Sequence, residues 1–324
     1  MNANAYPIEL TFPEISAHEH SDTGIPYVHT FDSGAAGPHV MINALTHGNE
    51  VCGAIVVDAL LRAKLRPRRG KLTLSFANVD AYARFDPSRP DAARFVDQDF
   101  NRVWTAQTLD NASLDSSELR RARAMRPVLD TVDLLLDLHS MHEKSKPLIV
   151  SGPLAKGIAL AEQLGTPATV ISDEGHPEGR RMRDYEGFGD PQSPRNALLI
   201  ECGQHWEASA LAVARDVTAR FLALSGVVDA QDLPAGWTMP LPDEMLIVRV
   251  TEPVVAKSPD FRFADAYTGL EVFPEAGSVI GWSDGEAVRT PYPDCMLVMP
   301  SLRQLRAGVT VVRLGRIERR VKAA

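Results

Sequence analysis

Short apolar runs that alternate with helix-like segments are the feature that most constrains how this chain can fold. Three runs, Val40–Leu45, Asp133–Leu138 and Ala197–Ile200, have the length and composition of strands buried in the centre of a sheet. Strands that alternate with helices predict an α/β fold, with a mixed, mostly parallel sheet flanked by helices. The segments with helical periodicity are Val51–Leu65, Ser116–Val132 and Ala208–Leu224.

The character of the sequence changes after about residue 225. Pro234, Gly236, Pro240 and Pro242 punctuate a predicted linker. Strand-like segments with turn residues between them follow the linker. We therefore expect two domains, residues 1–228 and a smaller all-β domain over residues 229–324. The expected C-terminal strands are Met245–Val250, Val272–Trp282, Met296–Met299 and Val309–Leu314.

Composition limits the partners and the compartment of the protein. The 324 residues carry a formal net charge of −8, which disfavours binding to nucleic acid or to an anionic membrane by bulk charge. Three cysteines make no disulfide framework and favour a reducing compartment. The N-terminal residues lack the pattern of a signal peptide, and no apolar run has the length of a membrane span. We therefore expect a cytoplasmic protein that acts on a small molecule, with homo-oligomerisation possible.

Histidine and glutamate residues stand where two of the predicted strands end. His47 and Glu50 follow the run Val40–Leu45, and His139 follows Asp133–Leu138. Ligands of open α/β sheets bind beyond the carboxyl ends of the strands, so the three side chains are expected to meet there. Zinc takes His and Glu ligands, and a catalytic site needs three of them. The alternatives are a solvated turn for His47 and Glu50, and a strand-end His139 satisfied by a backbone carbonyl.

Two further features bear on chemistry at the same strand ends. Glu201 ends the apolar run Ala197–Ile200, where burying a carboxylate without a partner is costly. It could be a general base beside a metal-bound water, or alternatively a helix cap or a structural ion pair. The segment from Arg94 to Arg102 concentrates two arginines, an asparagine and two carboxylates. It suits recognition of a carboxylate, although an exposed charged loop is the alternative.

Together these pieces resemble the succinylglutamate desuccinylase/aspartoacylase family of the zinc carboxypeptidase-like superfamily. The resemblance covers roughly the first 225 residues, and it implies one Zn²⁺ per chain and a C-terminal domain that caps or shapes the active-site cleft. The matching pieces are His47-Gly48-Asn49-Glu50, Asp99-Phe100-Asn101-Arg102, Asp137-Leu138-His139 and Ile200-Glu201-Cys202-Gly203.

The resemblance also implies a role for each matching residue. His47, Glu50 and His139 would be the zinc ligands, and Asp99 would orient the first zinc-bound histidine. Glu201 would be the general base that later protonates the leaving amine. Arg94 would polarise the scissile carbonyl and stabilise the oxyanion. Asn101 and Arg102 would bind the carboxylate of the substrate.

The implied function is therefore hydrolysis of the amide bond of an N-acyl amino acid or a related small amide that bears a carboxylate. A zinc carboxypeptidase for short peptides and a non-catalytic metabolite-binding homologue are the alternatives. The residues leave open which acyl group and which amine are joined. His142 lies farther from the strand end and is expected to point to solvent. Candidates to complete the substrate pocket are Arg183, Arg195, Tyr267 and Tyr292.

Overall fold

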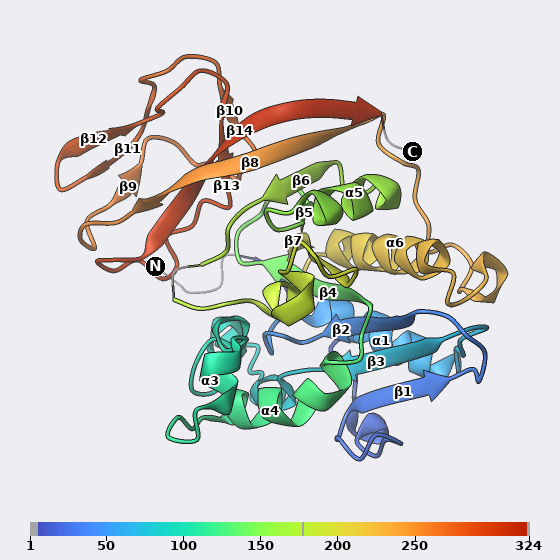
Figure 1. The fold of residues 1–324 in the computed structure, drawn as a ribbon. Coiled ribbons are helices and arrows are strands. Elements are labelled where there is room, and N and C mark those ends of the chain that lie inside the picture. The colour runs from blue at the N-terminus through green and yellow to red at the C-terminus, as the bar shows by residue number, and fades with distance from the viewer. Residues whose placement is uncertain (1–5, 177, 323–324) are drawn as a thin grey trace.

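One large sheet runs through the molecule, with helices on both of its faces (Figure 1). The structure is a computed structural model, and it describes residues 6–176 and 178–322. The eleven strands follow one another in the order β1-β3-β2-β4-β7-β5-β6-β8-β14-β13-β10. Their bounds are β1 Val28–Asp32, β2 His39–Ala44, β3 Lys71–Phe76, β4 Leu134–Met141, β5 Leu148–Val150, β6 Thr169–Ser172, β7 Asn196–Gln204, β8 Glu244–Val255, β10 Val272–Phe273, β13 Cys295–Val298 and β14 Thr310–Lys322.

The part of the sheet that carries the expected site is parallel. Strands β3, β2, β4 and β7 run in one direction, and β2 and β4 are buried along almost their whole length. Strand β5 runs against β7, and β6 is parallel to β5 and to β8. Strands covered on both faces read as continuous apolar runs, which is why the central strands could be recognised in the sequence. The expected mixed, mostly parallel sheet is confirmed for this part of the chain.

Alternate side chains of the central strands pack into two different hydrophobic cores, one on each face of the sheet. Ile42 and Leu136 pack with α1, α5 and α6 on one face, whereas Met41 and Leu135 pack with α4 on the other. This alternation follows from the two-residue period of a strand. Helix α4 begins after Ser116, whose side chain accepts a hydrogen bond from the backbone nitrogen of Leu119. The α-helices are α1 Val51–Arg62, α2 Val79–Tyr82, α3 Ala106–Asp110, α4 Ser117–Leu129, α5 Ala155–Leu164 and α6 Ala208–Ser225.

Several connections between the helices and strands contain short helical turns. They are 3₁₀ turns of three or four residues, and two of them lie in the long polar segment between β3 and α3. The turns are Ser16–His18, Pro90–Ala93, Phe100–Arg102, Met182–Asp184, Glu186–Phe188 and Ala230–Asp232.

The C-terminal strands extend the central sheet and add a small second sheet. Strand β8 pairs in parallel with β6, and the long β14 pairs with β8 in the antiparallel sense. The second sheet has three strands in the order β12-β11-β9. Division of the chain into domains at residue 228 stays a prediction. The bounds of the second sheet are β9 Arg262–Phe263, β11 Val279–Ser283 and β12 Glu286–Arg289.

The prediction of a single strand over Val272–Trp282 is wrong. Two strands stand there instead, β10 and β11, and they belong to different sheets. Pro274 follows β10 directly, and Gly277 has a φ of +83°, which turns the chain between the two strands.

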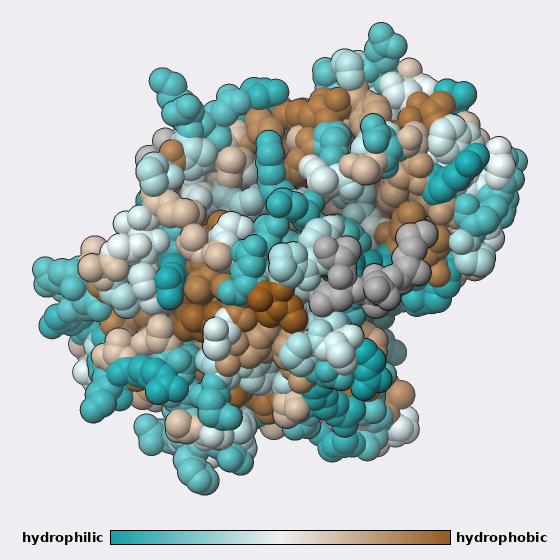
Figure 2. All heavy atoms as spheres, turned by 180° about the vertical axis from the view of Figure 1, so that it is seen from behind, coloured by the Kyte–Doolittle hydropathy of each residue, from teal (hydrophilic) through white to brown (hydrophobic). Residues whose placement is uncertain are grey.

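The surface seen from behind mixes hydrophilic and hydrophobic side chains (Figure 2). Large hydrophobic residues that are exposed lie apart from one another in the sequence, at Leu114, Leu224, Val255 and Val272. Within the described residues, no helix combines the length and the apolar character that a membrane span requires.

Candidate active site

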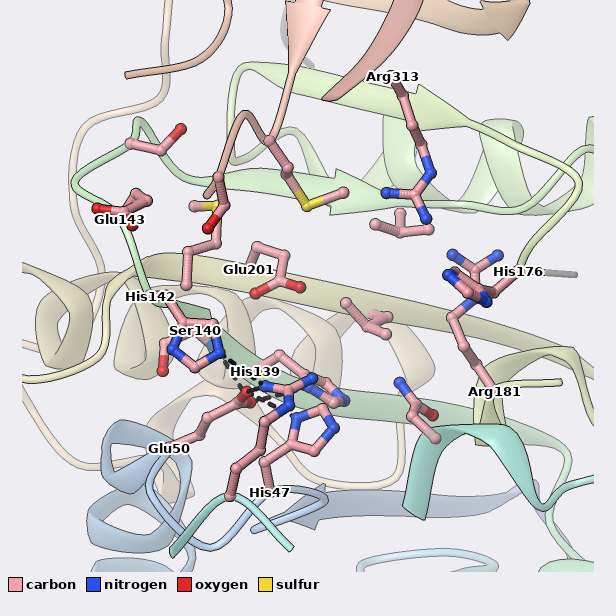
Figure 3. Close-up of a pocket in the computed structure, with 18 of the residues that line it drawn as sticks. His47, Glu50, His139, Ser140, His142, Glu143, His176, Arg181, Glu201 and Arg313 are labelled. Carbon is pink, nitrogen blue, oxygen red and sulfur yellow. Dashed lines mark hydrogen bonds and ion pairs between the residues drawn. The ribbon is translucent and has the colours of Figure 1, made fainter. Parts of the chain in front are cut away.

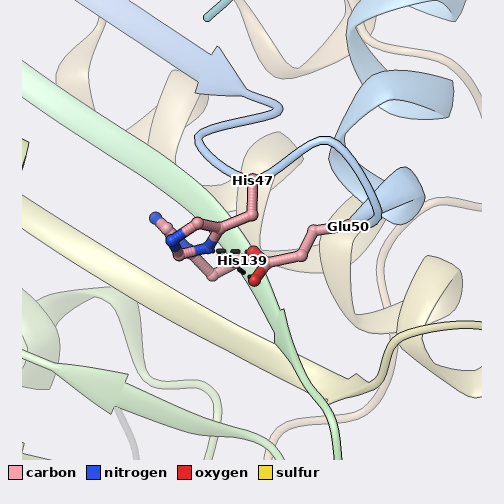
Figure 4. Close-up of side chains that lie close together, drawn as sticks. All are labelled: His47, Glu50 and His139. Atoms are coloured by element: carbon pink, nitrogen blue, oxygen red, sulfur yellow. Dashed lines mark hydrogen bonds and ion pairs between the residues drawn. The ribbon is translucent and has the colours of Figure 1, made fainter. Parts of the chain in front are cut away.

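Two histidines and a glutamate converge where β2 and β4 meet the start of α1 (Figure 4). His47 lies in the turn after β2, Glu50 immediately precedes α1, and His139 lies in β4. Nδ1 of His47 is 2.7 Å from Oε1 of Glu50, and Nδ1 of His139 is 2.9 Å from Oε2. One ligand atom from each side chain lies within 4.8 Å of the others, and all three residues are buried. The side chains expected as metal ligands are therefore together.

Each histidine turns its second ring nitrogen to another carboxylate. Nε2 of His47 is 3.0 Å from Oδ1 of Asp99, and Nε2 of His139 is 2.9 Å from Oδ2 of Asp137. Carboxylates in such positions fix the tautomer and orientation of a metal-binding imidazole. The geometry at Asp99 agrees with the role implied by the family resemblance.

Asp137 is a further residue of the site, for which no role was predicted from the sequence. It lies in the middle of a buried strand, and its Oδ1 accepts hydrogen bonds from Nδ2 of Asn43 and Oγ1 of Thr46. The signal was present, because a carboxylate inside an apolar run has to find partners.

The charges of this group reinforce one another. Burial raises the pKa of Glu50, but the charges of His47 and His139 hold this pKa well below its ordinary value. Burial lowers the pKa of His139, but Asp137 and Glu50 raise it well above its ordinary value. The carboxylates therefore favour positive charge on the imidazoles between them, and a bound divalent cation would supply that positive charge instead.

Gly48 allows the turn of the ligands to approach the long polar segment closely. Its backbone nitrogen donates to the carbonyl oxygen of Arg94, and a Cβ at this position would lie 2.4 Å from the nitrogen of Tyr82. Any larger residue would force the two segments apart. The contact places Arg94 beside the ligands, with Nη1 3.3 Å from Oε1 of Glu50 and Nη2 3.3 Å from Oδ2 of Asp99.

Asn101 and Arg102 lie in the 3₁₀ turn that follows Asp99. Asn101 uses Oδ1 to accept a hydrogen bond from the backbone nitrogen of Met182, so its amide nitrogen is the group left to donate. Arg102 donates from Nη1 to the carbonyl oxygen of Asn101, and its Nη2 is 3.9 Å from Oδ2 of Asp99. Both side chains line the same cavity as the ligands.

Glu201 lies beside His139 on the neighbouring parallel strand, because the register pairs these two residues. Among the described residues, its Oε2 has no hydrogen-bond partner although the atom is buried. Burial raises the pKa of Glu201 to about 8, and the charge of Glu50 acts in the same direction. It does not cap a helix, and it forms no ion pair in the part of the chain that the structure describes.

The cavity has a volume of about 200 Å³ and is also lined by residues of the C-terminal part of the chain, among them Arg313 of β14 (Figure 3). Arg183, Arg195, Tyr267 and Tyr292 are absent from the described residues that line it. Arg195 binds the carbonyl oxygens of Val132 and Leu129 instead. The additional arginines that reach the cavity are Arg181 and Arg313.

His142 lines the cavity, so the expectation that it points to solvent is wrong. Its Nδ1 is 3.2 Å from Nε2 of the fully buried His205, and its Nε2 is 3.4 Å from Nη1 of Arg94. The strand β4 continues to Met141, which carries His142 inward over the site.

The fold and the buried His–Glu–His group at the strand ends define a class of α/β proteins with a potential metal centre. The model of the succinylglutamate desuccinylase/aspartoacylase catalytic domain matches residues 36–225. The chain belongs to this family.

Solved structures agree with the fold. A succinylglutamate desuccinylase/aspartoacylase from Rhodobacter sphaeroides superposes with a TM-score of 0.65 at 17% identity, over 91% of this chain and 90% of that one. For murine aminoacylase 3 the TM-score is 0.64 at 20% identity, over 89% and 97% of the two chains.

A curated relative shows sequence similarity over a shorter stretch. The N-acyl-aromatic-L-amino acid amidohydrolase (carboxylate-forming) A of Danio rerio is 29% identical over 103 residues. The aligned part covers 29% of this chain and 30% of that protein.

Proposed function

We propose that this protein is a zinc-dependent hydrolase that cleaves the amide bond of an N-acyl amino acid or of a related small amide. The observation that carries the proposal is the Oε2 atom of Glu201, which is buried and has no hydrogen-bond partner among the described residues, beside the His47–Glu50–His139 group. A ligand set and a nearby proton acceptor are the two parts that metal-assisted hydrolysis requires. Membership of the family supports the same reaction.

The donor set fits zinc. Two imidazole nitrogens and one carboxylate, with a carboxylate behind each imidazole, are typical of catalytic zinc sites, which keep one position open. When bound, the ion would polarise the amide carbonyl and lower the pKa of a water molecule.

Glu201 is the group that moves protons in this proposal. Oε2 accepts a proton from the attacking water and afterwards donates it to the nitrogen of the leaving amine. A carboxyl group whose pKa lies near neutrality can do both, and burial raises the pKa of Glu201 to about 8. The cation would lower this value toward neutral pH.

Arg94, Asn101 and Arg102 are the groups that bind the substrate in this proposal. The guanidinium of Arg94 stabilises the negative charge that develops on the carbonyl oxygen. The amide nitrogen of Asn101 and the guanidinium of Arg102 donate to the carboxylate of the substrate, which fixes its position.

Arg313 points to an acidic substrate. Behind it, Arg181 and Arg183 share Asp173 and Asp184, so three guanidinium groups meet two carboxylates. Arg313 has no hydrogen-bond or ion-pair partner within the described residues, and it points into the cavity (Figure 3). Burial, together with the charges of Arg102 and Arg313, lowers the pKa of the neighbouring His176 to about 4, as expected at a positive end of the cavity.

The test is a hydrolysis assay with zinc-loaded protein and with chelator-treated protein. The panel contains N-acetyl, N-succinyl and N-formyl amino acids with acidic, aliphatic and aromatic side chains, and N-blocked dipeptides. We expect turnover of N-acyl amino acids that is lost with the chelator and restored by zinc. Hydrolysis of dipeptides alone would favour a carboxypeptidase, and zinc binding without hydrolysis would favour a metabolite-binding protein.

The cytoplasmic location stays part of the proposal. The three cysteines are free and buried, which supports a reducing compartment.

A further inference from the structure

Arg303 joins the C-terminal strands to the loops that carry the site. It lies between β13 and β14 and contacts two carboxylates from distant parts of the chain. Nη1 is 2.8 Å from Oδ2 of Asp91, and Nε is 2.9 Å from Oε1 of Glu143. Asp91 belongs to the polar segment that also carries Arg94, and Glu143 follows His142. One guanidinium therefore holds together the two segments that meet above the ligands.

The two ring nitrogens of His142 face groups that fix its tautomer. Nε2 is 3.4 Å from Nη1 of Arg94, and a guanidinium can only donate a hydrogen bond, so Nε2 has to accept. The proton of the neutral ring therefore lies on Nδ1. This nitrogen is 3.3 Å from Oδ1 of Asp91 and 3.2 Å from Nε2 of His205.

The tautomer of His142 also determines that of the buried His205. If Nε2 of His205 accepts from His142, then Nδ1 of His205 carries the proton and donates to Oγ of Ser140 at 2.8 Å. One arrangement of hydrogens is consistent with all of these contacts, with the Nδ1 proton of His142 shared between Asp91 and His205, and the carboxylate of Asp91 favours it. Arg303 in turn keeps Asp91 at the ring.

We propose that Arg303 is a positioning residue that acts on Arg94 through Asp91 and His142. The contacts of Arg94 with Glu50 and Asp99 are both 3.3 Å long and would pull the guanidinium down onto the ligands. Nη1 lies between Oε1 of Glu50 and Nε2 of His142, so the acceptor on His142 opposes the pull of Glu50 and keeps Arg94 at the cavity that it lines. Arg303 thus affects the reaction without contact with the substrate. The inference rests on the role proposed above for Arg94.

The kinetic test is a double-mutant cycle with the zinc-loaded enzyme. We expect Arg303→Met to lower kcat roughly tenfold with little change in KM, because a small misplacement of a catalytic group has effects of this size or larger. In the Arg94→Met background the same substitution should have almost no further effect. Arg306→Met, at an exposed position in the same segment, is the matched control and should resemble the wild type. A full tenfold loss in both backgrounds would overturn the proposal.

A second measurement is independent of turnover. Nitrogen-15 chemical shifts of the imidazole rings, with His142 assigned from His142→Gln, report the tautomer directly. We expect Nδ1 of His142 to be protonated in the wild type and in Arg306→Met, and a mixture of tautomers in Arg303→Met. An unchanged tautomer in Arg303→Met would refute the positioning role even if none of the amides were hydrolysed. Failure of hydrolysis with the expected shifts would refute the proposed function alone.

Discussion

His139 and Glu201 stand side by side on two adjacent parallel strands, in register, with the ring of one and the carboxylate of the other at the same strand ends. His139 is held from both sides, by Glu50 and by Asp137, whereas the Oε2 atom of Glu201 has no partner within the described residues. The backbone therefore places a fixed metal-ligand candidate next to a carboxylate that is available to a substrate or to water.

Removing one ligand should abolish zinc binding. His139→Ala leaves two donors, which are too few for a tight catalytic site. We expect about one zinc per chain in the wild type and little in the variant, measured by atomic emission after dialysis. His20→Ala, an exposed histidine in the N-terminal segment, should retain the metal. Equal zinc contents in His139→Ala and the wild type would contradict the assignment.

Asp137→Asn should weaken zinc binding without removing a ligand. The amide can still contact Asn43 and Thr46, but it no longer stabilises the proton on Nε2 of His139 as a carboxylate does. A loss of affinity of about 10- to 100-fold is expected for such a partner. Competition with a chromogenic chelator measures it, with the exposed Asp190→Asn as control. An affinity within about twofold of the wild type would show that Asp137 is only structural.

The metal-free protein should lose stability as the pH rises toward 8. Burial raises the pKa of Glu201 from its ordinary value of 4.5 to about 8, so between these values the folded state binds more protons than the unfolded state. The free energy of unfolding therefore decreases with pH in this window. Urea unfolding of chelator-treated protein at pH 5, 6, 7 and 8 measures the slope. Glu201→Gln should flatten it, and an equal slope in both proteins would contradict the assigned pKa.

Arg313→Met should reduce the preference for substrates with a second carboxylate. The guanidinium has no other ion-pair partner in the described part of the chain, so its contribution is available to the substrate. We expect KM to rise about tenfold or more for a substrate with two carboxylates, and little change for one with a single carboxylate. Three substrates locate the second carboxylate. N-acetyl-glutamate carries it on the amino acid, N-succinyl-alanine carries it on the acyl group, and N-acetyl-alanine lacks it.

A control on the same strand sharpens this comparison. Arg316 lies in β14 with its side chain exposed over the ring of Tyr292, away from the cavity. Arg316→Met should leave all three KM values unchanged. Equal losses on all three substrates in Arg313→Met would mean that the residue supports the fold rather than specificity.

The central strands and the candidate metal ligands could be predicted from the sequence, because each depends on residues close to it along the chain. The central strands are apolar along their length because helices cover both faces. His47 and Glu50 come shortly after β2, and His139 lies near the end of β4. The sequence also located Glu201, because a carboxylate at the end of an apolar run is unusual. These features depend on neighbours along the chain or on the rule that parallel strands end at one edge.

Features that depend on long-range pairing were not predictable. Strand β14 runs to Lys322, but its last residues alternate with charged side chains that face solvent beside β8, so they carry little apolar signal. Arg313 reaches the cavity only because β14 pairs with both β8 and β13. His142 turns inward because Asp91, Arg94 and His205 surround it, and these residues come from two other segments of the chain.

The most direct test of the central claim is the Glu201→Gln variant, measured for zinc content and for turnover in the same preparation. Gln keeps the size of the side chain and the ligand set but cannot accept and release the proton. We expect one zinc per chain, as in the wild type, and a kcat reduced by a factor of at least about 10² to 10⁴. Glu286→Gln, in the distant strand β12, should be fully active. A Glu201→Gln variant with zinc bound and near-normal turnover would contradict the account.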